Sequence, residues 1–123
     1  MEANKEILDR FVKEVVHNIY DDGLKYFKQL STGTAKWGTG SEYTSVLNKL
    51  SNEDKKTLQK YIAETLSTSI FGFLKIFEEC DEYKLYYEKD GQRVNLTEIS
   101  EMLKAEPIIE DGWIKRFSKE SDT

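Results

Sequence analysis

The stretch GTAKWGTGSE, residues 33–42, comes closest in composition to a phosphate-binding loop. Such a loop has the pattern G-x-x-x-x-G-K-[ST] and joins a strand to a helix. Two glycines here have the required spacing, but Thr39 and Gly40 occupy the positions of the lysine and the hydroxyl residue. The dinucleotide pattern G-x-G-x-x-G also lacks its third glycine. We therefore predict a connector whose Trp37 either packs on the core or contacts a partner.

The sequence offers few groups for metal binding or nucleophilic catalysis. His17 is the only histidine and Cys80 the only cysteine, and nothing in the sequence pairs them as base and nucleophile. Neither the calcium-loop pattern D-x-D-x-D-G nor the zinc pattern H-E-x-x-H occurs. We expect His17 on the solvated face of the first helix, and we expect no catalytic residues, cofactor or metal.

Four carboxylates gather where the second long helix is predicted to end: Glu78, Glu79, Asp81 and Glu82. The helix macrodipole favours cations at this end, so the run opposes the dipole. Charge runs of this kind are mostly solvated surface, and Lys75 and Lys84 offset part of the charge. The alternative interpretation is a docking patch for a basic partner protein.

The segment YKLYYEKDGQRVNL, residues 83–96, alternates with a period of two around Asp90-Gly91, which is a strong hairpin signal. A two-residue turn there predicts three cross-strand pairs: Glu88 with Arg93, Tyr87 with Val94, and Leu85 with Leu96. We expect Tyr83 and Tyr87 to face the core with Leu85. Tyr86 is expected on the outer face, where an aromatic residue among charges is typical of an ordinary edge strand and also suits a protein contact.

The first half of the chain is predicted to be helical, over residues 3–79. Apolar residues recur every three or four positions through residues 3–31, and the stripe comprises Ile7, Leu8, Phe11, Val12, Val15, Val16, Ile19, Leu24, Phe27 and Leu30. Asp22-Gly23 interrupts the stripe, so this segment is either one bent helix or two helices.

A short helix over residues 42–50 and a long helix from Ser51 to about Glu78 follow. Ser51 reads as the N-cap, with Asp54 three residues later. The long stripe comprises Leu58, Ile62, Leu66, Ile70, Phe73 and Phe77, widened by Tyr61, Phe71 and Leu74. A stripe of this width predicts a central helix covered on more than one side. The small residues from Ser67 to Gly72 would let a neighbouring helix approach closely.

The C-terminal third is predicted to add a short helix capped by Thr97 and stopped by Pro107, and a third strand over residues 113–117. Residues 119–123 form a polar tail. We predict a single domain over residues 1–123 with a helix-dominated α+β fold, in which two long amphipathic helices and shorter ones pack with an antiparallel hairpin or three-stranded sheet. The alternative is an all-helical bundle with a protruding hairpin.

Composition restricts the partners. The net charge of −5 argues against nucleic-acid binding, which needs clustered Lys and Arg. The most apolar stretch, residues 69–77, is too short to cross a bilayer and contains Lys75, so we expect no membrane span. The N-terminus lacks the apolar core of a signal peptide, and one cysteine cannot form an internal disulfide. We expect a cytoplasmic protein.

Three stretches of the final third, SIFGFLKIFEE, YKLYYEKDGQRVNL and EDGWIKRFS, give the chain a resemblance over residues 58–118. It resembles small bacterial proteins of the toxin-immunity type, in which a hydrophobic helix precedes a hairpin and a closing glycine-aromatic segment. The resemblance implies a non-enzymatic cytoplasmic protein that binds another protein. It brings no functional residues with it.

Two functions follow as hypotheses. The first is a protein-binding module, such as an immunity protein that neutralises a bacterial toxin, with a basic partner bound through the acidic run, Tyr86 and Trp37. The second is a small-molecule binder or minor enzyme with a pocket between the long helices and the hairpin. The sequence signal for this pocket is the small-residue stretch from Ser67 to Gly72, which aromatic residues surround. The oligomeric state does not follow from the sequence.

Overall fold

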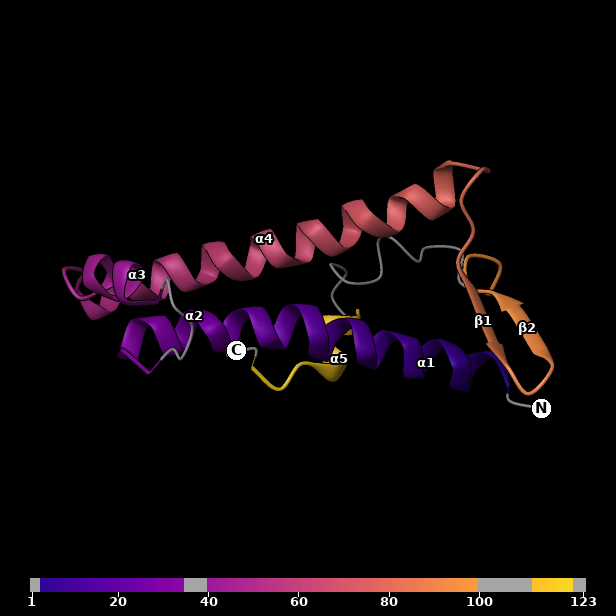
Figure 1. Cartoon of the computed structure of the whole chain (residues 1–123), viewed down its shortest axis with the longest axis horizontal. Helices are drawn as coiled ribbons and strands as arrows, with labels where there is room; N and C mark the ends of the chain where they lie inside the picture. The colour runs from indigo at the N-terminus through magenta and orange to yellow at the C-terminus, as the bar shows by residue number, and fades with distance from the viewer. Residues whose placement is uncertain (1–2, 35–39, 100–111, 121–123) are drawn as a thin grey trace.

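The computed structural model describes residues 3–34, 40–99 and 112–120. Its elements are α1 (Asn4–Val15), the π-helical turn η1 (Val16–Asp21), α2 (Asp22–Thr32), α3 (Gly40–Leu47), α4 (Asn52–Glu79), β1 (Tyr86–Lys89), β2 (Gln92–Asn95) and α5 (Trp113–Phe117). Figure 1 shows two long helical rods, with α3 at one end and the hairpin at the other. The helix-dominated α+β fold is thus confirmed.

The first rod is one continuous helical path, because α1, η1 and α2 follow one another without a break. Gly23 does not end the helix, and the irregularity lies just before it, in η1. The buried residues Val12, Val16, Tyr20 and Leu24 are each four positions apart, which in an α-helix turns the stripe by about 40° per step. A π-turn holds more residues per turn and keeps them in line. It also rotates Ile19, which we had expected in the stripe, into an exposed position.

Helix α4 begins as predicted, since the Ser51 side chain accepts a hydrogen bond from the Asp54 backbone N–H. Its expected coverage on several sides is not found among the residues that the structure describes. Among its described residues, only Ile70 and Leu74 are buried, and Phe73 is 58% exposed. The helix packs on one side, against the first rod (Figure 1).

The predicted close approach is made by a different glycine. A Cβ atom on Gly23 of α2 would lie 2.8 Å from Cδ1 of Leu66, whereas one on Gly72 would have no atom within 4 Å. Gly72 therefore lies outside the contact between the rods, and the missing side chain at Gly23 leaves room on α2 for Leu66.

The hairpin has the predicted register. Glu88 pairs with Arg93 and Tyr87 with Val94, and the Leu96 N–H donates to the Leu85 carbonyl oxygen at 2.9 Å. Asp90 and Gly91 both have positive φ angles, of 49° and 82°, as a two-residue turn of this type requires. Tyr83, which we expected in the core, is 56% exposed, because the strand begins only at residue 86 and the alternation does not extend back to it.

Residues 113–117 form the helix α5 instead of a third strand, so the sheet of the described residues has two strands. Trp113 and Ile114 are buried against the first rod, and the Trp113 ring meets Phe11 edge-on, with centroids 6.3 Å apart. In a segment of five residues helical and strand periods cannot be told apart, and the helical form places Trp113, Ile114 and Phe117 on one side.

Two clusters make up the core. The larger joins the first rod, α4 and α5 through Val12, Val16, Tyr20, Leu24, Ile70, Leu74, Trp113 and Ile114. The smaller joins α2 and α3 through Phe27, Leu30 and Leu47. The predicted helix after Thr97 falls largely on residues 100–111, outside the described residues, and Thr97 itself lies in a turn fixed by the Asn95 side chain.

Candidate interaction surface

The acidic run lies at the tip of the molecule where α4 ends, beside the hairpin (Figure 1). Cys80 leaves the helical conformation, and its carbonyl oxygen accepts a hydrogen bond from the Tyr83 N–H at 3.2 Å. The run, comprising Glu78, Glu79, Asp81 and Glu82, thus spans the end of the helix and the turn that follows it. Glu78 is half-buried and the others are exposed. Glu79 pairs with Lys75 at 3.9 Å, a contact between two half-exposed side chains that offsets little of the charge.

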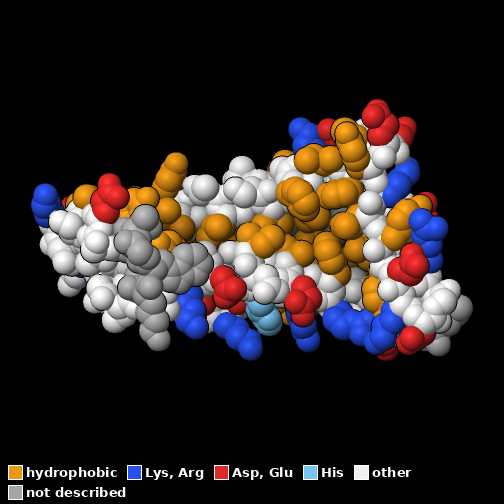
Figure 2. All heavy atoms as spheres, viewed as in Figure 1, with side chains coloured by type: hydrophobic (Ala, Val, Ile, Leu, Met, Phe, Trp, Pro, Cys, Tyr) orange, Lys and Arg blue, Asp and Glu red, His pale blue; other side chains and the backbone are white. Residues whose placement is uncertain are grey.

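Exposed apolar side chains lie next to these acids. Phe73 and Tyr83 each expose more than half of their surface, and Phe77 is half-buried. The rings of Phe73 and Phe77 meet edge-on at 5.4 Å, so the two form one aromatic unit. Figure 2 shows a broad hydrophobic area over the C-terminal half of α4, with red acidic side chains at its upper edge. We call Phe73, Phe77, Tyr83 and the four acids the apolar–acidic surface.

Sequence reasoning missed the aromatic part of this surface, because Phe73 and Phe77 matched the period of a buried stripe. The available signal was the width of that stripe, which exceeds what one packing partner covers. An excess of apolar residues around a helix indicates either burial on all sides or an exposed apolar face, and a large exposed patch marks an interaction site.

Tyr86 is exposed on the outer face of the hairpin, as predicted. The guanidinium carbon of Arg93 lies 4.2 Å from its ring centroid, and Arg93 also pairs with Glu88 at 3.8 Å. The ring is thus stacked against a cation, which holds Tyr86 in place on the strand. Trp37 lies outside the described residues, and α2 and α3, which flank its segment, lie at the end of the molecule opposite the hairpin (Figure 1).

A groove of about 310 Å³ lies between α1 and the hairpin, lined by Ile7, Arg10, Phe11, Glu14, Leu85, Tyr86, Tyr87 and Leu96. Arg10 donates to the Tyr87 hydroxyl at 3.0 Å and lies over the Tyr87 ring. The groove therefore has an apolar floor and a charged rim. The small-residue stretch of α4 is not among the residues that line this groove.

His17 is not solvated as we expected. It is half-buried in η1, and its Nε2 donates to the Phe117 carbonyl oxygen at 3.1 Å. Its partner comes from the end of α5, a contact between residues 100 positions apart that no local pattern encodes. Cys80 is exposed at the tip of α4 and is not among the partners of His17. His17 therefore has a structural role, because it joins η1 to the end of α5.

Within the described ranges, no group of three or more His, Cys, Asp and Glu side chains is arranged to hold a metal ion. The same ranges contain no helix with the length and apolar character needed to cross a membrane. No protein-family model, curated protein or solved structure matches this chain. Any functional conclusion therefore depends on the surface itself.

Proposed function

We propose that this chain is a protein-binding module and that the apolar–acidic surface is its binding site. The observation that carries the proposal is an exposed aromatic area with acidic side chains at its edge, at one tip of the fold (Figure 2). Aromatic residues are enriched among those that dominate binding energy, and surrounding polar residues exclude water from them. Phe73 supplies such an anchor, since its exposed position contributes little to the core.

The charge of the surface favours a basic partner. Four carboxylates within five residues produce a local negative field that adds to the net charge of −5. Such a field accelerates association with a positively charged surface more than it raises affinity. The resemblance to toxin-immunity proteins supports one version of this role, in which the chain occupies a basic toxin in the cytoplasm and blocks it.

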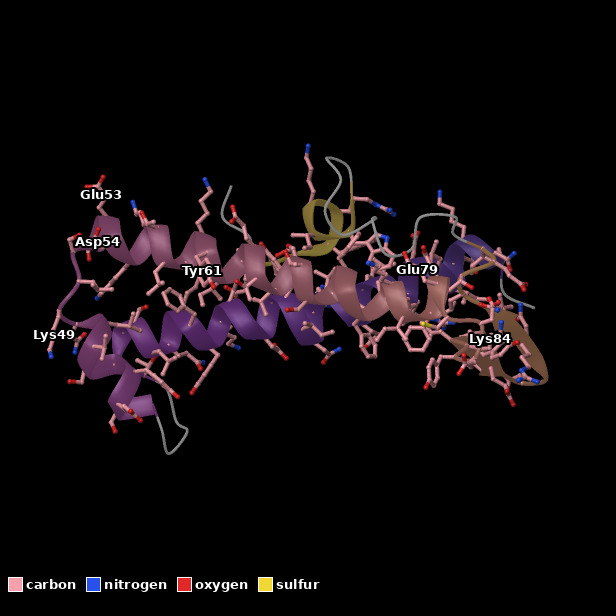
Figure 3. The ribbon with its side chains drawn as sticks, turned by 90° about the horizontal axis from the view of Figure 1, so that it is seen from above. Lys49, Glu53, Asp54, Tyr61, Glu79 and Lys84 are labelled. Atoms are coloured by element: carbon pink, nitrogen blue, oxygen red, sulfur yellow. The ribbon has the colours of Figure 1, made fainter. Side chains whose placement is uncertain are left out.

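The test uses the product of the reading frame next to this gene, expressed and purified as the binding partner. Association and dissociation rates are measured at low and high salt for Asp81→Asn/Glu82→Gln. The matched control is Glu53→Gln/Asp54→Asn, which makes the same charge change at the other end of α4 (Figure 3). We expect the first variant to associate several-fold more slowly at low salt and the control to behave as wild type.

The aromatic part is tested separately with Phe73→Ala. Its matched control is Tyr43→Ala, which removes a comparably exposed ring from α3. We expect Phe73→Ala to raise the dissociation rate by at least tenfold, corresponding to a binding residue worth more than about 1.4 kcal/mol. Equal dissociation rates for Phe73→Ala and Tyr43→Ala would show that the apolar–acidic surface is not the binding site.

The groove between α1 and the hairpin favours a second candidate, a small-molecule binder. Its volume lies at the lower end of the range for ligand sites, and Arg10 and Glu14 at the rim could hold a ligand with both a carboxylate and an ammonium group. A thermal-shift screen with small zwitterionic metabolites tests this, with Arg10→Met as the variant that should lose any stabilisation. A screen without a hit rejects the second candidate.

A further inference from the structure

The outer side of α4 has a regular, exposed and largely uncharged face. Its residues are Tyr61, Thr65, Thr68, Gly72 and Ile76, all exposed. Their spacings of four, three, four and four are those of a seam along which two helices pack. Figure 1 shows no other labelled element on this side of α4, and Figure 3 looks down onto the helix, with Tyr61 near one end of the face and Glu79 beyond the other.

The composition of this face differs from that of the preceding two turns. Over residues 61–76 the exposed positions carry only two charged side chains, Glu64 and Lys75. Over residues 52–60 the exposed positions include Glu53, Asp54, Lys56 and Lys60. A helix face in contact with water normally carries charges throughout, so the later segment has the character of a face that is covered.

The charges at the margins of this face are arranged symmetrically with opposite sign. Glu64 and Lys75 are centred on the point between residues 69 and 70, and so are Lys60 and Glu79. Among the described residues, no side chain pairs with Glu64 or Lys60, while Lys75 meets only Glu79 of its own chain. A copy of the helix running in the opposite direction would therefore place each charge opposite its counterpart.

We propose that this face binds a second copy of the chain, with the two α4 helices antiparallel about a twofold axis near residues 69–70. Glu64 of each copy then lies near Lys75 of the other, and Tyr61 lies near Ile76 of the other. A parallel arrangement would place Glu64 beside Glu64 and Lys75 beside Lys75. A closed twofold dimer uses the same patch on both copies, as this symmetry requires. The inference does not rest on the proposed function, but Glu79 belongs to both surfaces.

Gly72 provides the most direct test. A side chain there would meet no atom within 4 Å in the single chain, and the residue lies in regular helix. Gly72→Glu is therefore compatible with the fold, and replacing a helical glycine removes a destabilising residue. In the antiparallel dimer it places two like charges near the twofold axis. The matched control is Ser45→Glu, at an exposed position of α3.

Sedimentation equilibrium of the full chain over a concentration series measures the association. We expect a reversible dimer for wild type and Ser45→Glu, and at least tenfold weaker association for Gly72→Glu, whose melting temperature should be no lower than that of wild type at concentrations where both are monomeric. A wild-type chain that stays monomeric at several hundred micromolar overturns the proposal. A dimer unaffected by Gly72→Glu also overturns it, because another face would then be in contact.

A charge exchange then tests the direction of the helices. Glu64→Lys and Lys75→Glu should each weaken the dimer by about tenfold, since each turns two attractive pairs into repulsive ones. The double variant should recover wild-type association, and a mixture of the two single variants should form a heterodimer. Failure of both recoveries overturns the antiparallel arrangement.

Discussion

Asp21 and Ser118 are 97 positions apart in the sequence, yet the Ser118 hydroxyl donates a hydrogen bond to the Asp21 carboxylate at 2.5 Å. Asp21 is buried at the end of η1 and also accepts hydrogen bonds from the backbone N–H groups of Lys119 at 2.9 Å and Glu120 at 3.3 Å. One carboxylate thus binds three donors from the chain after α5. The first residues of the segment expected as a polar tail are held in place by this contact.

Asp21→Asn should destabilise the fold by about 1–3 kcal/mol, because the amide turns a donor toward N–H groups that need an acceptor. Urea unfolding followed by circular dichroism measures the change. Asp22→Asn is the control, since Asp22 is the exposed neighbour in sequence, and its effect should stay within about 0.5 kcal/mol. Similar losses of unfolding free energy for both variants would show that the hydrogen bonds to Asp21 contribute nothing specific to stability.

The two helical glycines should respond oppositely to alanine. Gly23→Ala forces the Leu66 side chain to move from a Cβ contact of 2.8 Å, and we expect a loss of about 1–3 kcal/mol. Gly72→Ala meets no atom and should gain up to about 1 kcal/mol from helix propensity. Thermal unfolding of both variants compares them directly. In a Leu66→Ala background, Gly23→Ala should no longer cost stability, because the side chain that it would strike is absent. If the loss came from helix propensity alone, Leu66→Ala would not change it.

Trp113→Ala should cost about 3–5 kcal/mol, because it empties a site in which the side chain is 1% exposed. The docking of α5 can also be observed by fluorescence in a Trp37→Phe variant, in which Trp113 is the only tryptophan. Its emission should be that of a buried indole and shift to longer wavelength on unfolding. Emission typical of a solvated indole in the native protein would contradict the placement of α5.

Gly91→Val should destabilise the hairpin by about 1–2 kcal/mol, because a β-branched residue resists the φ angle of 82° at that position. Asp90→Asn should be nearly neutral, since asparagine accepts a positive φ angle readily. The chemical shifts of Tyr87 and Val94 report the pairing in both variants. Intact pairing and stability in Gly91→Val would indicate a different turn conformation.

Local patterns in the sequence predicted several elements correctly. The Asp90-Gly91 turn determines which residues pair, so the hairpin register followed from the turn alone. The N-cap at Ser51 followed in the same way, since the cap and its N–H donor are three residues apart. Both depend on interactions within a few positions, which a pattern can encode.

Features decided by contacts distant in sequence were predicted poorly. His17 is half-buried because the end of α5 packs on η1, and Phe73 is exposed because no described element covers that side of α4. Residues 113–117 are helical for a similar reason, since packing against the first rod selects between two local possibilities. The acidic run was identified from sequence, but its aromatic neighbours became visible only once the coverage of α4 was known.

The π-turn at Val16–Asp21 holds one residue more than a regular α-helix needs over the same path. Deleting one residue within it would restore a regular α-helix and leave the helix after it in nearly the same orientation to α1. Deleting a residue from the regular part of α1 would instead turn everything downstream by about 100°, so that Leu24, Phe27 and Leu30 would face away from α3 and α4. A change of one residue in length should therefore be tolerated within the π-turn and rejected in the regular helix on either side of it, so the π-turn is the place where relatives of this fold would differ in length.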